Sequence, residues 1–181
     1  RYMASHNTDG SYNTSFTYAD GSSTSTSYNP EGSISASSSH TLNADDSSTD
    51  VWQYVDGLHG TRVSYPDGSN AGTNYSADGS ISFSYSHTVN TDGSSTDAWQ
   101  SGDGTYGVYA RSADGSGAST NYNADGSISY TSSHTVNADG STVDSWQQTS
   151  DGSYGVDAYY ADGSNASTAY NADGSIFESS S

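Results

Sequence analysis

The chain has 181 residues, only 30% of them hydrophobic, and a formal net charge of −18. This composition resembles that of disordered chains, but 16 tyrosines and 3 tryptophans offer large surfaces for burial and the sequence is periodic, so we predict ordered structure. The charge disfavours binding to nucleic acid or anionic membrane surfaces, the absence of cysteine excludes disulfides and thiolate chemistry, and no apolar run reaches the roughly 18 residues of a transmembrane helix.

Almost four copies of one unit follow one another along the chain. His40, His87 and His134 each begin a similar string and are spaced 47 residues apart, and the three tryptophans keep the same spacing. We therefore predict a partial repeat at residues 1–39 and repeats at 40–86, 87–133 and 134–181, with one inserted residue near Gln148. Because the sequence starts and stops inside repeats, we expect it to be a segment of something longer.

Each repeat contains a shorter period marked by an acidic residue followed by glycine. These pairs recur at steps of 11, 11, 11 and 14 residues, and between them serine or threonine alternates with tyrosine, isoleucine, valine or alanine. Alternation with a period of two indicates strands. The predicted fold is all-β: a tandem antiparallel β-hairpin meander, coiled into a spiral or solenoid-like array, with four strands per 47-residue repeat and one of them longer than the rest.

The turns between strands are predicted from proline and glycine. Pro30 and Pro66 occupy the second position of their turns, where a fixed φ favours a type I turn, and glycine follows two residues later. A type I turn followed by a left-handed glycine makes the three-residue hairpin with a bulge. The predicted turn residues are Asn29, Pro30, Gly32, Asp67, Gly68, Asn123, Asp125, Gly126, Asn137, Asp139 and Gly140.

This turn type fixes which residues face each other across each hairpin. It predicts Tyr122 opposite Ile128, and Tyr106 between Trp99 and Tyr122. It also predicts one histidine–aspartate pair per repeat, namely His40 with Asp50, His87 with Asp97 and His134 with Asp144. We expect all these residues on one tyrosine, isoleucine, valine and tryptophan face, and serine and threonine on the other.

Calcium binding and catalysis are two functions that the motifs suggest only weakly. The string from Asn121 to Gly126 resembles the first half of an EF-hand loop, but Ser132 stands where the bidentate acidic ligand belongs. We predict structural turns and no cofactor, with weak calcium binding to the clustered carboxylates as the alternative. The histidine–aspartate pairs have no distinctive nucleophile beside them, so we predict cross-strand hydrogen bonds and no enzyme activity.

The sequence offers two kinds of site for sugars, one for binding and one for covalent attachment. Aromatic stripes can stack on sugar rings, although here packing is the favoured role of the aromatic face. Three glycosylation sequons begin at Asn13, Asn74 and Asn165 but share no repeat position, so the expected serine and threonine face is the better candidate for attached glycans.

The segment from Tyr122 to Ile128 resembles the core motif of YD (RHS) repeats, and the segments Tyr75 to Ile81 and Tyr170 to Ile176 repeat it. The family motif reads Tyr-Asp-x-x-Gly-Arg-Leu. This sequence has asparagine in place of the aspartate, serine in place of the arginine, and a 47-residue period in place of a shorter one. The resemblance implies tandem β-hairpins wound into a spiral sheet on secreted or cell-surface bacterial proteins.

These observations lead us to expect a structural protein, extracellular or on a bacterial cell surface, that forms a filament or a surface stalk. Its expected partners are copies of itself joined end to end, because the edge strand of one repeat matches that of the next. The alternative is an adhesin-type carbohydrate-binding module or, with less support, an ice-binding one, since serine, threonine and asparagine mix irregularly.

Overall fold

The computed structural model describes residues 1–181 and confirms an all-β antiparallel meander. Sixteen strands lie in the sheet in chain order, and there is no helix that could cross a membrane. The strands are β1 Tyr2–His6, β2 Tyr12–Thr17, β3 Ser23–Tyr28, β4 Ile34–Leu42, β5 Ser48–Tyr54, β6 His59–Ser64, β7 Asn70–Tyr75, β8 Ile81–Val89, β9 Ser95–Ser101, β10 Tyr106–Arg111, β11 Gly117–Tyr122, β12 Ile128–Val136, β13 Thr142–Gln148, β14 Tyr154–Tyr159, β15 Asn165–Tyr170 and β16 Ile176–Ser180.

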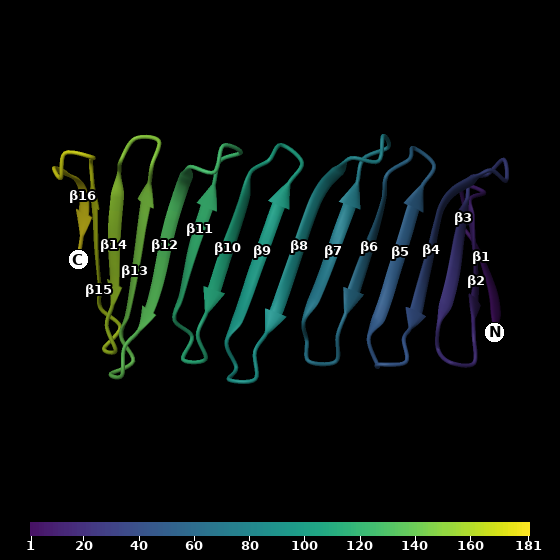
Figure 1. Ribbon diagram of the computed structural model, residues 1–181, viewed down its shortest axis with the longest axis horizontal. Coiled ribbons are helices and arrows are strands. Elements are labelled where there is room, and N and C mark those ends of the chain that lie inside the picture. The colour runs from purple at the N-terminus through teal and green to yellow at the C-terminus, as the bar shows by residue number, and fades with distance from the viewer. The chain divides into compact units, whose positions relative to one another are not determined.

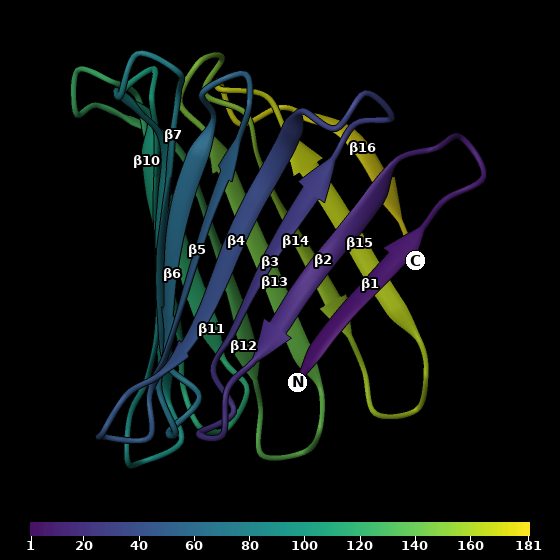
Figure 2. The ribbon, with the colours of Figure 1, turned by 90° about the vertical axis from the view of Figure 1, so that its right-hand side faces the viewer.

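The chain divides into two compact units, Arg1–Ser86 and His87–Ser181. Within the first unit, β1 to β6 follow one another as neighbours with alternating direction (Figure 2). Within the second, β9 to β16 do the same (Figure 1). The hairpin is therefore the building element of both units, as the alternation of side chains predicts.

Strands β4, β8 and β12 are nine residues long, and β4 and β12 carry a β-bulge. In β12, Ile128 lies opposite Tyr122 while Tyr130 lies opposite Asn121, so Ser129 is an extra residue. The same shift occurs at the start of β4 and of β16. The Ser129 carbonyl is not left unpaired, because it accepts a hydrogen bond from the Thr149 backbone N–H at 3.0 Å.

The bulge makes the predicted division into an aromatic face and a hydroxyl face wrong. One extra residue moves every following side chain to the opposite face. Tyr122 therefore shares its face with Ile128, Thr131 and Ser133, whereas Tyr130 and Ser132 lie on the other. We name the first the tyrosine face, and the second, which carries Trp52, Trp99 and Trp146, the tryptophan face.

The predicted contact of Trp99 with Tyr106 is also wrong. Tyr106 lies opposite Gln100 on β9 and opposite Tyr122 on β11, while Trp99 lies opposite Gly107. Ser101 and Thr105 close a three-residue turn of the predicted type, and that turn places Gln100, rather than Trp99, opposite Tyr106.

The turn after β13 contains the inserted residue expected near Gln148. There the Gln148 N–H donates to the Ser153 carbonyl, a separation of five residues, whereas the Asn123 N–H donates to the Ser127 carbonyl, a separation of four. The extra residue is absorbed in the turn, so the following strands keep the pairing of the earlier repeats.

No hydrophobic side chain is buried anywhere in the structure. The only buried polar side chains are those of Ser22 and Ser47, which lie directly after turns. A sheet of this kind is held by its backbone ladder, its cross-strand pairs and its turns, rather than by a core.

Candidate functional site

The turn formed by Asn123 to Ser127 has the hydrogen bonds of a type I turn followed by a bulge. The Gly126 N–H donates to the Asn123 carbonyl at 2.9 Å, and the Asn123 N–H donates to the Ser127 carbonyl at 2.8 Å. Gly126 has φ 83°, in the left-handed region that favours glycine. The turns at Asn29, Tyr65 and Asn137 have the same two bonds, so all the predicted turn residues lie in such turns.

Side chains within many of the turns form a small network that sequence reasoning did not find. The Asn123 amide donates to the Ser127 hydroxyl at 2.9 Å, and that hydroxyl donates to Oδ1 of Asp125 at 2.6 Å. The Ser127 backbone N–H donates to the same oxygen at 2.9 Å. The serine that follows glycine in most turns is the signal that could have revealed the network.

These hydrogen bonds change the acidity of the turn aspartates. The Ser127 hydroxyl first, and the Ser127 backbone N–H second, lower the pKa of Asp125 below its ordinary value of 3.8, because both stabilise the ionised carboxylate. Hydrogen bonds from the hydroxyl and the backbone N–H of the residue two places later lower the pKa of all these turn aspartates: Asp9, Asp45, Asp78, Asp92, Asp103, Asp125, Asp139, Asp151, Asp162 and Asp173.

The turn carboxylates are the groups that a metal ion would need, and they are used within their own turns. No group of three or more histidine, aspartate or glutamate side chains is placed to hold a metal ion.

One histidine–aspartate pair lies in each repeat, at the place the register predicts. The Nδ1–Oδ1 distance is 2.7 Å for His40 and Asp50 and 2.6 Å for the other two pairs, His87 with Asp97 and His134 with Asp144. The side chains are about a third to a half exposed. Each of the three histidines makes this one hydrogen bond.

Stacked aromatic pairs are the most regular feature of the tyrosine face. Tyr106 and Tyr122 stack at 4.5 Å between ring centroids with 12° between their planes, and Ile128 lies opposite Tyr122. The equivalent pairs are Tyr12 with Tyr28, His59 with Tyr75, and Tyr154 with Tyr170. We call each pair, with its following isoleucine, an aromatic row.

The tryptophan face is organised differently, since each tryptophan covers a glycine on the next strand. Trp146 lies opposite Gly155, and a Cβ at Gly155 would come within 2.5 Å of the Trp146 Nε1. The same relation joins Trp52 to Gly60 and Trp99 to Gly107. Only glycine leaves room for the indole to approach the sheet this closely.

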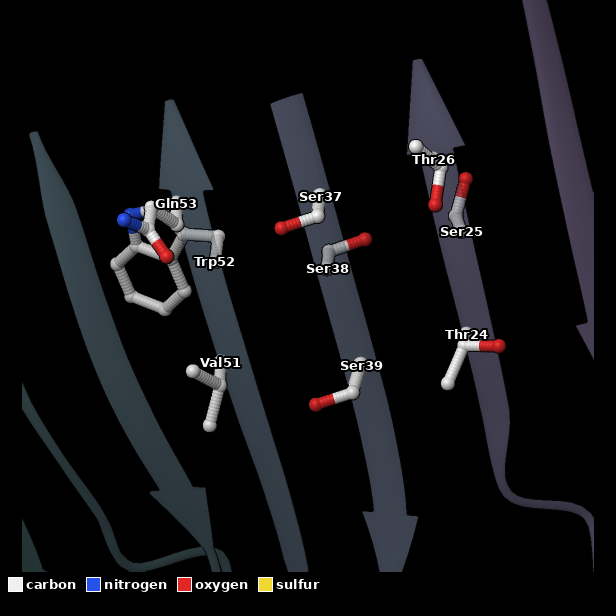
Figure 3. A pocket seen from close by; sticks show the side chains of 9 residues that line it. All are labelled: Thr24, Ser25, Thr26, Ser37, Ser38, Ser39, Val51, Trp52 and Gln53. Carbon is white, nitrogen blue, oxygen red and sulfur yellow. The ribbon is translucent and has the colours of Figure 1, made fainter. Parts of the chain in front are cut away.

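Two shallow grooves lie on opposite faces of β3, β4 and β5 in the first unit. The groove on the tyrosine face is lined by threonine and serine of β3 and β4 with Val51, Trp52 and Gln53 of β5 (Figure 3). The groove on the tryptophan face, about 250 Å³, is lined by Ser25, Ser27, Ala36, Ser37, Ser38, Trp52 and Tyr54. The same three strands line both grooves because successive side chains of a strand point to opposite faces. In Figure 3, Ser37 and Ser39 are directed away from Ser38.

No protein-family model matches the chain, and a search of curated proteins gives no significant match. The resemblance to YD repeats therefore stays a prediction.

Proposed function

We propose that this is a structural repeat protein of the cell exterior, whose copies assemble into a filament or a surface stalk. The observation that carries the proposal is that no hydrophobic side chain is buried, while apolar side chains recur in register on the tyrosine face. Its role is passive and mechanical, with no catalysis.

The aromatic rows are the surface through which copies would associate. The isoleucines that end the rows are strongly exposed, with fractions of 53% for Ile34, 50% for Ile81, 43% for Ile128 and 60% for Ile176. A single sheet with such a face gains stability when another layer covers it. A second copy of this chain fits that need, because its rows have the same spacing and chemistry.

Edge-to-edge growth is the second contact that we propose. Successive long strands pair with the strand that follows in the same register, as β4 with β5 and β12 with β13. An exposed strand edge of one copy can therefore offer a matching copy the backbone groups of one more repeat. The charge of −18 would keep such an assembly hydrated.

Electron microscopy and sedimentation velocity of the purified protein test the proposal. We expect filaments or large oligomers, and we expect Tyr122→Ser to reduce them because it removes a ring from an aromatic row. Tyr109→Ser is the matched control, since it deletes a tyrosine of the tryptophan face on the neighbouring strand. Monomers at every protein concentration, or equal effects of both substitutions, would contradict assembly through the tyrosine face.

A further inference from the structure

The groove on the tryptophan face of β3, β4 and β5 differs from the equivalent places in the other repeats. Ala36 stands in it where the repeat period places Phe83 and Tyr130. Tyr54 stands at its border where the period places Ser101 and Gln148. This groove therefore has a methyl group where Phe83 and Tyr130 carry a ring, and an aromatic wall where Ser101 and Gln148 carry a polar side chain.

The hydroxyl groups in this groove are free, unlike those of the corresponding pair on β11 and β12. Ser119 and Ser132 bond to each other at 2.9 Å in the second unit, across β11 and β12. Their counterparts, Ser25 and Ser38, also lie opposite each other but make no side-chain hydrogen bond with the protein. Two hydroxyls at the floor of an open groove can therefore donate to and accept from a ligand.

The equivalent place at β7 and β8 is occupied by a side chain of the protein. The Tyr85 ring lies over Gly72, close enough that a Cβ there would come within 2.7 Å of the ring. Phe83 lies next to Tyr85, with 6.2 Å between ring centroids. The fold thus fills the place at β7 and β8 with an aromatic ring and leaves the place at β3 and β4 open.

The side chains that line the groove determine which ligand it could bind. Trp52 and Tyr54 offer apolar surface for C–H groups, and the serines offer hydrogen bonds. No charged side chain lines the groove, so it has no partner for a ligand charge, and the net charge of −18 repels anions. The geometry points to a binding site for one ring of a neutral sugar, held between Trp52 and the hydroxyls of Ser25 and Ser38.

This site goes beyond the structural role and does not depend on assembly, because it lies on the face opposite the aromatic rows. It would let an acidic fibre or stalk attach to a neutral glycan. The carboxylates of the turns take no part in it.

Saturation-transfer NMR with the full chain tests the site, using glucose, galactose, mannose and N-acetylglucosamine as neutral probes and glucuronic acid as the anionic one. We expect saturation transfer to at least one neutral sugar and less to glucuronic acid. Ala36→Tyr should abolish the transfer while preserving the fold, since tyrosine is the native residue at the equivalent position 130.

Trp146→Ala is the matched control for Trp52→Ala, because both remove an indole that covers a glycine. We expect only Trp52→Ala to weaken the saturation transfer. No transfer to any neutral sugar, transfer that survives Ala36→Tyr, or stronger transfer to glucuronic acid would overturn the inference. Because the readout is independent of oligomer size, it separates failure of this site from failure of the filament.

Discussion

Asp46 is the one residue other than glycine with a left-handed backbone conformation, at φ 63°. It occupies the turn position at which Gly140 stands two repeats later. A side chain in this conformation costs roughly 1–2 kcal/mol, because Cβ approaches the following carbonyl oxygen. We therefore predict that Asp46→Gly increases the free energy of unfolding by about 1 kcal/mol, measured by chemical denaturation.

The reverse exchange provides the control. Gly140 has φ 83° and no atom within 4 Å of the position that a Cβ would take, so Gly140→Asp changes only backbone strain. We expect it to lower the free energy of unfolding by a similar amount. A stabilising Gly140→Asp, or a neutral Asp46→Gly, would contradict this account of the turn.

The hydroxyl of Ser127 sets the titration of Asp125. Since that hydrogen bond is the largest cause of the lowered pKa, we predict that Ser127→Ala raises the pKa of Asp125 toward 3.8, measured from the carboxyl ¹³C shift. Ser129→Ala should leave this pKa unchanged, because the Ser129 side chain makes no hydrogen bond. An equal pKa in all three proteins would count against the network.

The hydrogen bond between Asp125 and Ser127 also predicts that the stability of the fold depends on pH. The folded-state pKa of Asp125 is lowered, so its contribution to stability is present above the ordinary pKa and is lost as the pH falls through the lowered value. The difference in melting temperature between the native protein and Ser127→Ala should therefore shrink between about pH 6 and about pH 2. A difference that stays constant over that range would show that the carboxylate is not involved.

At the scale of the strand pair, packing of tryptophan on glycine should be measurable. Gly155→Ala places a methyl within 2.5–2.8 Å of three Trp146 ring atoms, so the ring must move. We predict a loss of about 1–3 kcal/mol in the free energy of unfolding. In a Trp146→Ala background the same change should cost much less, and an equal cost in both backgrounds would contradict the contact.

Turns and hairpin partners are predictable from the sequence because their causes are local. Pro30 has a fixed φ, Gly126 supplies the left-handed conformation, and the residues between fix which side chains face each other. That is why the partners of Tyr122 and His134 across their own turns follow from the sequence.

The assignment of faces is not predictable in this way, because the bulge at Ser129 has a distant cause. The alternation of residues from Ile128 to Ser133 reads the same with or without an extra residue. The Ser129 carbonyl is satisfied by the Thr149 N–H, which follows β13, the strand on the other side of β12 from Tyr122. The groove at Ala36 carried a sequence signal, a small residue where Phe83 and Tyr130 stand in later repeats, but its lining comes from three neighbouring strands.

At the scale of the whole molecule, two chemistries are separated onto two surfaces. The aromatic rows and their isoleucines lie on the tyrosine face, while the tryptophans and the histidine–aspartate pairs lie on the other. The turns place carboxylates at both ends of the strands. A sheet without a core can in this way use one face for self-association and leave the other free for ligands.

Net charge sets the condition under which the tyrosine faces can meet. Each copy carries −18, so two copies repel one another while the apolar rows attract. Raising the salt concentration from about 0.01 M to about 0.15 M shortens the Debye length from roughly 30 Å to roughly 8 Å, which screens the repulsion and leaves the apolar attraction. We predict that sedimentation velocity shows larger assemblies at the higher salt concentration, and that Tyr122→Ser removes most of this increase. Assemblies that dissolve as salt is added would instead mean that ion pairs hold the copies together. The chain has only three arginines and no lysine to form such pairs.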